Sequence, residues 1–337
     1  MTINRAWLNQ IQEEIIEPDM PIVDPHHHFW RTGNWGRYLL DDLWADTNDG
    51  PGDTSHNIIK TVFIECGAEY LTSGPQHMRP VGETIFVEEI ATAARSQPEQ
   101  AQIAGIVNFA DMTRGEAVEE VLVAQLEAGN GLFRGIRHHA SRDDSDDVPN
   151  SRINPPADLY DRATFRAGLK KLGEMELTFE AWLYHPQLPQ LIALAQAVPE
   201  TTIILNHLGG VLGIGPYAGK RDEIFVTWQE SIRQLSQCEN VVVKLGGLAQ
   251  GVNGYGWETR DLPPTSDELA EAQRPWHLHA LECFGANRCM FESNYPVEAM
   301  SVSYHVWWNT CKKIAAGLSN AEKWALFVGT ATRVYQI

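Results

Sequence analysis

The chain has 337 residues, of which 43% are hydrophobic, so it can bury a sizeable core within one large domain. It carries 26 Lys and Arg residues against 44 Asp and Glu residues, which gives a net charge of −18. This charge disfavours binding to nucleic acid and to anionic membranes. We therefore expect a small-molecule ligand, and an anionic one requires a local basic pocket.

Five cysteines are scattered along the chain without a CxxC pair, which indicates free thiols in a reducing compartment. No apolar run approaches the roughly 18 residues of a membrane span, and the acidic first twenty residues do not resemble a signal peptide. These features predict a cytoplasmic protein without a membrane-spanning segment. The eleven tryptophans are compatible with a homodimer interface and equally with a core.

The start of the chain differs from the rest of it. We interpret residues 1–20 as an N-terminal extension and residues 21–337 as one domain. Leu8, Ile11 and Ile15 have helical spacing, which predicts a short helix packed on this domain.

Short apolar runs then alternate with amphipathic segments. Eight runs are predicted as strands: 21–24, 58–66, 103–109, 132–138, 177–184, 201–206, 241–246 and 288–293. Between them, helices are predicted at 83–96, 114–128, 187–198 and 223–237. Alternating strands and helices indicate a parallel sheet, because parallel strands need crossover connections. Eight such units predict a single α/β domain folded as a (β/α)₈ TIM barrel.

Three connections that follow strands are long, at 139–163, 208–222 and 247–275. In a barrel, the loops after the strands line the active end. The tail predicts a helix over 303–317 and a second over 319–328, which begins with the capping box Ser319-Asn320-Ala321-Glu322.

Most of the predicted strands end in polar side chains, as a barrel active site requires. The candidate residues are His26, His28, Glu65, Arg137, His138, Glu180, Tyr184, His207, Lys244, Glu292 and Asn294. His26 and His28 are one residue apart and point to the same side of an extended strand, whereas His27 is expected to face away.

Three of these histidines suit a metal. His26, His28 and His207 can hold one divalent ion, with Zn²⁺ preferred, and leave a position open for water. The alternative is that no metal is required and that the histidines polarise the substrate carbonyl directly.

Glu292 and Asn294 share a face of the last strand. Asn294 is expected to orient water or to donate to a developing oxyanion. Glu292 either supplies a catalytic carboxylate or forms a buried structural ion pair.

The cations at the strand ends have two interpretations. Arg137 and Lys244 are predicted to hold a substrate carboxylate or hydroxyls, with His138, Glu180 and Tyr184 also lining the substrate pocket. The alternative is that these two cations form salt bridges inside the barrel with Glu65 or Glu180.

Several motifs together resemble one known family. They are Asp24-Pro25-His26-His27-His28-Phe29-Trp30, Phe133-Arg134-Gly135-Ile136-Arg137-His138, Leu205-Asn206-His207-Leu208-Gly209-Gly210, Val243-Lys244-Leu245-Gly246-Gly247, Met290-Phe291-Glu292-Ser293-Asn294-Tyr295-Pro296 and Phe327-Val328-Gly329-Thr330-Ala331-Thr332-Arg333-Val334-Tyr335. In this order they resemble the amidohydrolase superfamily, in the branch of amidohydrolase-related lactonases that includes 2-pyrone-4,6-dicarboxylate, L-fucono- and L-rhamnono-lactonases.

The resemblance implies a distorted TIM barrel with long loops after the strands and a site where His26, His28 and His207 converge. It also implies an Asp on the last strand that acts as general base, and here this position is Asn294, which cannot take a proton at neutral pH.

The activity implied is a hydrolase that opens a lactone of a small organic or sugar acid. Two alternatives remain: a decarboxylase or hydratase on the same scaffold, and a barrel that binds a ligand without catalysis.

Overall fold

The computed structural model describes residues 3–32 and 36–337. Its eight parallel strands form one sheet in chain order, as predicted. They are β1 (Pro21–His27), β2 (Asn57–Ile64), β3 (Gln102–Asn108), β4 (Phe133–Arg137), β5 (Thr178–Ala181), β6 (Ile203–Leu205), β7 (Val241–Leu245) and β8 (Cys289–Phe291).

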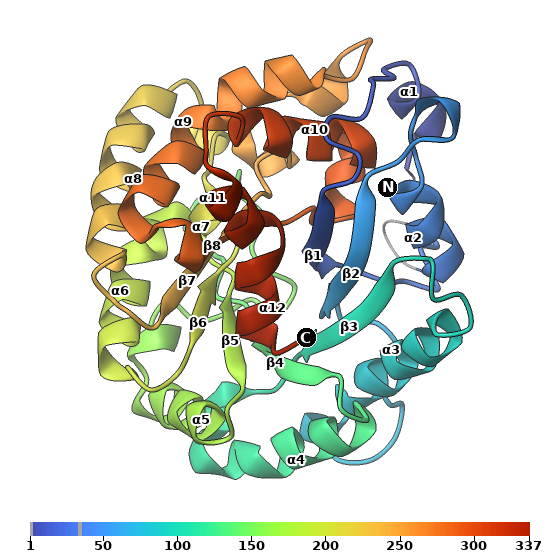
Figure 1. Cartoon of the computed structure of the whole chain (residues 1–337). Helices are drawn as coiled ribbons and strands as arrows, with labels where there is room; N and C mark the ends of the chain where they lie inside the picture. The colour runs from blue at the N-terminus through green and yellow to red at the C-terminus, as the bar shows by residue number, and fades with distance from the viewer. Residues whose placement is uncertain (1–2, 33–35) are drawn as a thin grey trace.

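The two edges of this sheet meet. Residues His27 and Tyr295 form a parallel bridge, and the backbone amide of His28 donates to the carbonyl of Tyr295 at 2.8 Å. The sheet therefore curls into a nearly closed barrel, which confirms the predicted (β/α)₈ fold. Figure 1 shows the strands arranged around a centre with helices outside them.

Helices connect and surround the strands. They are α1 (Arg5–Leu8), α2 (Leu40–Thr47), α3 (Val81–Ala94), α4 (Glu119–Ala128), α5 (Ala163–Glu174), α6 (Leu188–Ala197), α7 (His207–Gly210), α8 (Arg221–Leu235), α9 (Ser266–Phe284), α10 (Tyr304–Ile314), α11 (Asn320–Trp324) and α12 (Thr330–Tyr335). Among residues 3–32 and 36–337, no helix has both the length and the hydrophobicity needed to cross a bilayer.

Periodicity explains how the outer helices pack. In α8, Ile224, Trp228, Ile232 and Leu235 are buried, and their spacing of three to four residues places them on one face. The strands are buried on both sides, so β7 is a continuous run of buried residues without alternation.

The N-terminal segment differs from its prediction. Helix α1 is a single turn over Arg5–Leu8, and no helix continues through Ile15. Side chains of α10 satisfy the backbone there instead: Asn309 accepts from the amide of Ile16 at 3.0 Å and donates to the carbonyl of Glu14 at 2.9 Å. A short helix with Leu8 buried is therefore present, but Ile11 and Ile15 lie outside it, and long-range hydrogen bonds replace helical ones in the segment that follows.

The C-terminal helical region is longer than predicted. Its capping box at Ser319 and Glu322 is confirmed, but a π-helical turn over Ala325–Gly329 joins α11 to α12. Thr330 Oγ1 donates to the carbonyl of Ala286 at 3.1 Å, just before β8 begins. Helix α12 therefore closes the amino end of the barrel, which is the end seen in Figure 1.

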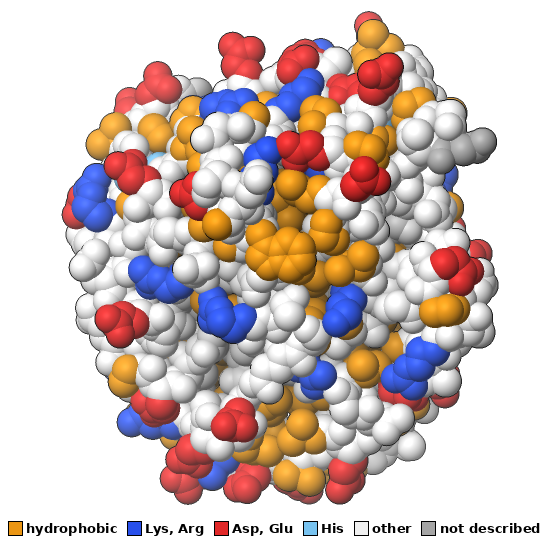
Figure 2. All heavy atoms as spheres, in the orientation of Figure 1, with side chains coloured by type: hydrophobic (Ala, Val, Ile, Leu, Met, Phe, Trp, Pro, Cys, Tyr) orange, Lys and Arg blue, Asp and Glu red, His pale blue; other side chains and the backbone are white. Residues whose placement is uncertain are grey.

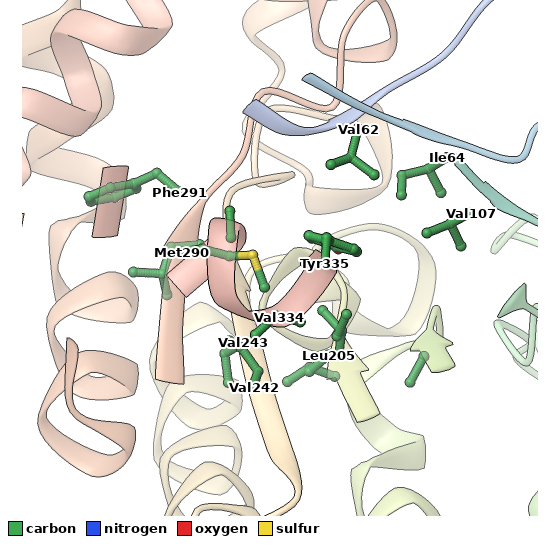
Figure 3. Close-up of a cluster of buried hydrophobic side chains, with 14 of the residues drawn as sticks. Val62, Ile64, Val107, Leu205, Val242, Val243, Met290, Phe291, Val334 and Tyr335 are labelled. Carbon is green, nitrogen blue, oxygen red and sulfur yellow. The ribbon is translucent and has the colours of Figure 1, made fainter. Parts of the chain in front are cut away.

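Figure 2 shows the surface of this amino end, with acidic and basic side chains both present and hydrophobic side chains gathered near its centre. Tyr335 points from α12 into the barrel, where Figure 3 shows it among Val62, Leu205 and Met290 of three strands. Its hydroxyl donates to Glu180, and Lys244 Nζ lies 5.5 Å from its ring centroid. Helix α12 therefore contacts the polar interior of the barrel from the amino end of the strands.

Candidate active site

The carboxyl ends of β1, β4, β7 and β8, with the turn after β6, bring five predicted residues together. They are His26, Arg137, His207, Lys244 and Glu292, and each is less than 5% exposed. Most of the sequence motifs therefore meet in one buried cluster at the end of the barrel opposite α12.

Glu292 is the centre of this cluster. Its Oε1 accepts from the Nδ1 of His207 at 2.7 Å and from the backbone amide of the same residue at 3.2 Å. Its Oε2 lies 2.7 Å from the Nδ1 of His26. Burial alone raises the pKa of Glu292, but His207 and Lys244 outweigh burial and hold that pKa below its ordinary value. The carboxylate is therefore ionised; it orients the imidazole of His207 through Oε1 and contacts the imidazole of His26 through Oε2.

These contacts fix the tautomers of two histidines. Arg137 Nη1 donates to the Nε2 of His26 at 3.3 Å, so the proton of a neutral His26 is on Nδ1, toward Glu292. Burial, then the charge of Lys244, lower the pKa of His26 well below its usual range. His207 likewise carries its proton on the Nδ1 that faces Glu292, and its Nε2 has no hydrogen-bond partner among residues 3–32 and 36–337.

The backbone around His207 is unusual. His207 and Leu208 both have left-handed conformations, with φ of 52° and 53°, which are costly for residues with side chains. Opposite them, Gly247 has φ of 68°, and a Cβ there would lie 2.3 Å from the Nδ1 of His207. The glycine after β7 therefore makes room for the imidazole, which is a reason for its place in the sequence motif.

His28 has different partners. Its Nδ1 lies 2.7 Å from the carbonyl of Ile64, and its Nε2 lies 3.3 Å from Oδ1 of Asn294. The carbonyl can only accept, so Nδ1 is protonated and Nε2 faces another acceptor. We infer that the amide of Asn294 is rotated, so that its nitrogen donates to His28 and its oxygen accepts a hydrogen bond from the protonated carboxyl of Glu298.

Glu298 fits this assignment. It is fully buried, it lies 3.0 Å from the amide of Asn294, and burial raises its pKa to about 8. The carboxyl group is therefore protonated at neutral pH. Glu298 was not among the residues predicted from the sequence, where its signal was its position four residues after Asn294 in the turn that follows β8.

Arg137 belongs to a second cluster around Glu65. Arg137 Nε donates to Glu65 Oε1 at 2.9 Å, and His139 and Arg152 also contact this carboxylate. This is the salt-bridge alternative for Arg137. Arg152 comes from the long loop 139–163 and was missed, because nothing in the sequence distinguishes one loop arginine from another.

Lys244 also forms the salt bridge that was one of its two interpretations. It is fully buried, and its Nζ lies 2.9 Å from Glu180, which also accepts from Asn206 and Tyr335. Glu180 is thus surrounded by interior partners and has no exposed surface, contrary to its predicted place in the substrate pocket. Lys244 Nζ also lies 3.4 Å from the Nδ1 of His26, so its positive charge disfavours protonation of that imidazole and lowers the pKa of His26.

Two predicted pocket residues lie elsewhere. His138 follows Arg137 directly and therefore points to the opposite side of β4, where its ring packs on Phe109 and Phe165. Tyr184 packs with Val148 and Leu212 in a small separate core, and its hydroxyl donates to the carbonyl of Pro149 at 2.6 Å. Neither residue contacts the His26 cluster. His27 faces away as predicted, against Phe29 and Phe63.

Asp24 joins the strands that carry the site. Its carboxylate accepts from the backbone amide of Ser293 at 3.0 Å, from the hydroxyl of Tyr304 at 2.9 Å and from the hydroxyl of Ser293. Burial raises the pKa of Asp24 to about 6, although these hydrogen bonds lower it. This first residue of the β1 motif therefore fixes the end of β1 against the turn after β8.

Three side chains of this cluster are candidates for holding a divalent metal. The described residues bring ligand atoms of His26, His207 and Glu292 within 4.8 Å of one another, and His28 is not part of this group. Contacts of 2.7 Å between Glu292 and the two imidazoles are hydrogen-bond distances, shorter than the roughly 3.3 Å between neighbouring ligands of tetrahedral zinc with bonds of about 2.0 Å.

Two fixed cations add to this mismatch. Arg137 faces one ring nitrogen of His26 and Lys244 lies near the other, so a dication bound to His26 would meet their repulsion. The buried Glu292 Oε2, which makes no well-directed hydrogen bond, is the atom that most favours a cation. His26, His207 and Glu292 are thus grouped closely enough to hold a divalent ion only if their mutual contacts open, and Arg137 and Lys244 place positive charge beside them.

Comparisons with known proteins agree with the fold and with the family that the sequence resembles. An uncharacterised protein of Sinorhizobium fredii is 29% identical over 95% of this chain and 99% of its own length. The L-fucono-1,5-lactonase of Burkholderia multivorans is 26% identical over 94% of this chain and 96% of its own.

The fold is also similar to that in a crystal structure of an amidohydrolase from Burkholderia multivorans with bound zinc, with a TM-score of 0.70 and 24% sequence identity. The match covers 94% of this chain and 100% of that chain. The amidohydrolase family model matches residues 23–337. Since this match covers nearly the whole chain, the protein is a member of the amidohydrolase family.

Proposed function

We propose that the protein is a lactonase, which hydrolyses the cyclic ester of a small organic or sugar acid. The observation that carries this proposal is the pairing of His207 with Glu292, which leaves one imidazole lone pair open at the carboxyl end of the barrel. A histidine oriented by a carboxylate is a general arrangement for removing a proton from an attacking water. Family membership and the lactonases among the relatives support the same reaction class.

The proposed reaction begins with a water molecule beside His207. The Nε2 of His207 takes a proton from this water, and the hydroxide oxygen bonds to the lactone carbonyl carbon. Glu292 stabilises the imidazolium that forms. The intermediate then expels the ring oxygen, which takes the proton back from His207, and a hydroxy acid is released.

The other groups have supporting roles. Arg137 is 4% exposed and has N–H donors beyond those that bind Glu65 and His26, so it is placed to stabilise the oxyanion. Asn294 and His28 form the adjoining wall, where the amide orients the water or the substrate. Lys244 is fully buried and acts only through the cluster.

The first experiment measures acid release from purified protein with a pH indicator, using sugar lactones, aliphatic lactones and pyrone carboxylates. We expect at least one lactone to be hydrolysed and the His207→Ala variant to lose about 10²-fold or more of kcat, because it lacks the base. The variant Gln229→Ala, in an outer helix, is a control for expression and folding. Full activity in His207→Ala would disprove the proposed mechanism.

The second experiment removes metals. Because Arg137 and Lys244 already supply positive charge at His26, we expect activity to survive chelation and dialysis and to gain less than about twofold from added Zn²⁺. Loss of activity with chelator, and its return with Zn²⁺, would show that His26, His28 and His207 rearrange around an ion as the sequence alone suggested.

The lyase alternative rests on the Asn294 position. No acid release from any lactone, together with CO₂ release or dehydration of a hydroxy acid, would favour a decarboxylase or hydratase. An Asn294→Asp variant separates the cases further, since a gain of lactonase activity only in the variant would indicate that the native reaction is different.

A further inference from the structure

A cavity of about 770 Å³ lies outside the His26 cluster, between the loops that follow β2, β3 and β4. We call it the loop cavity. It falls within the range of about 300–1,000 Å³ that is typical of small-molecule sites. Its lining combines the side chains of Arg79, Arg114 and His138 with apolar surface from Phe109, Pro155 and Leu159.

Three arginines line the cavity: Arg162 pairs with Asp158 at 2.9 Å, whereas the exposed Arg79 and the half-buried Arg114 are paired weakly or not at all within the described residues. Arg79 has no ion pair among the described residues. Arg114 has only a 3.7 Å contact with the exposed Glu120, and its buried Nε has no hydrogen-bond partner in the described part of the chain. In a chain with a net charge of −18, two weakly paired arginines at one cavity are an attractive site for an anion.

His138 lines the cavity with its ring. Its Nδ1 accepts from the backbone amide of Met112 at 3.2 Å, and the ring also makes a hydrogen bond with the backbone of Ala110. Burial lowers the pKa of His138 to about 4, which keeps the ring neutral at pH 7. The ring is held between Phe109 and Phe165, with centroid distances of 5.0 and 5.3 Å.

Asp111 provides the complementary acceptor. Its Oδ1 receives hydrogen bonds from the amide and hydroxyl of Thr113, at 3.0 and 2.5 Å. Its Oδ2 makes no hydrogen bond to residues 3–32 or 36–337, so it can accept from a ligand hydroxyl. The cavity therefore offers donors for a carboxylate, an acceptor for a hydroxyl and an apolar wall between them.

The side chains of Arg152 and Tyr70 lie between this cavity and the proposed reaction site. Arg152 Nη2 binds Glu65 on one side and lies 3.5 Å from the hydroxyl of Tyr70, a cavity residue, on the other. Arg137 and His138 are consecutive and face opposite sides of β4, toward the two sites.

We propose that the loop cavity is a second small-molecule site that binds a hydroxylated organic acid with a ring or hydrocarbon body. Arg79 and Arg114 bind its carboxylate, Asp111 accepts from its hydroxyl, and Phe109 and Leu159 contact the apolar part. This inference does not depend on lactonase activity, because binding is measured directly.

The test is titration calorimetry of the full chain with 4-hydroxybenzoate. We expect a Kd tighter than about 1 mM that weakens with added salt, whereas benzyl alcohol, which lacks the carboxylate, does not bind. Arg79→Gln and Arg114→Gln should each weaken binding by roughly tenfold, as expected for a lost charged hydrogen bond. The matched control Arg95→Gln removes an exposed arginine outside the cavity lining and should leave binding unchanged.

His207→Ala distinguishes the two sites. The proposal expects this variant to bind 4-hydroxybenzoate as the wild type does. Loss of binding in His207→Ala, with binding retained in both arginine variants, would place the ligand in the barrel and overturn the proposal. No binding of 4-hydroxybenzoate, benzoate or inorganic phosphate at about 10 mM would overturn it as well.

Discussion

Replacing Glu292 with Gln should abolish most of the activity, with a fall in kcat of roughly 10³- to 10⁴-fold. The amide keeps the shape of the side chain, but it carries no charge to stabilise the imidazolium of His207. Its NH₂ group also competes with the Nδ1–H donors of His207 and His26, which favours the wrong tautomers. Steady-state kinetics over a range of pH measure the effect.

The effect should exceed that of any other single change in the cluster, because Glu292 contacts two imidazoles at once. Circular dichroism and thermal melting show whether the fold is kept. Glu230→Gln, on the exposed face of α8, is the matched control and should retain wild-type kcat. A Glu292→Gln enzyme with kcat within tenfold of wild type would remove the basis for His207 as the base.

Replacing Glu65 with Gln should destabilise the protein by about 3–5 kcal/mol, since a buried charge that loses its partner is costly. Glu65 is fully buried and is the shared counter-charge of Arg137, His139 and Arg152. Arg152 is partly exposed and can turn to solvent, so the cost falls mainly on Arg137 and His139. We expect the melting temperature to fall by roughly 6–12 °C.

The pH dependence of the unfolding free energy tests the stabilising role of Glu65 independently. Burial raises the pKa of Glu65, but Arg152, His139 and Arg137 outweigh it and hold the pKa well below its ordinary value. A depressed carboxyl pKa contributes stability above the unfolded value of about 4.3, and this is lost as pH falls through the folded value.

The difference in unfolding free energy between wild type and Glu65→Gln should therefore be constant between about pH 5 and 8 and narrow below about pH 4. Denaturant melts at several pH values measure it. Glu230→Gln, which loses an exposed pair with Arg233, should change stability by less than about 0.5 kcal/mol. An equal effect of the two substitutions would contradict the role of Glu65.

The sequence predicted the barrel because its signals are local and repeated. Each strand is a short apolar run such as Val241–Leu245, each helix has its own period, and parallel strands leave few topologies. The same logic places the ends of the strands together, so His26, His207, Lys244 and Glu292 could be expected at one end of the barrel. The N-terminal helix is shorter than the spacing of Leu8, Ile11 and Ile15 indicated, and α10, nearly 300 residues away, supplies hydrogen bonds to the segment that follows it.

The partners of each site residue needed the tertiary structure. The spacing of apolar residues in the sequence does not predict that Glu292 contacts His207 whereas Glu180 contacts Lys244, because both glutamates follow apolar runs in the same way. The roles of Arg152 and Glu298 come from loops whose path depends on packing.

The sequence by itself thus determined the fold, the family motifs and the end of the barrel at which chemistry can occur. The tertiary structure alone decided which histidine keeps a free lone pair and which cations are neutralised. The physical reason is that hydrogen-bond direction and charge pairing act over about 3 Å and depend on side chains that converge from distant parts of the chain.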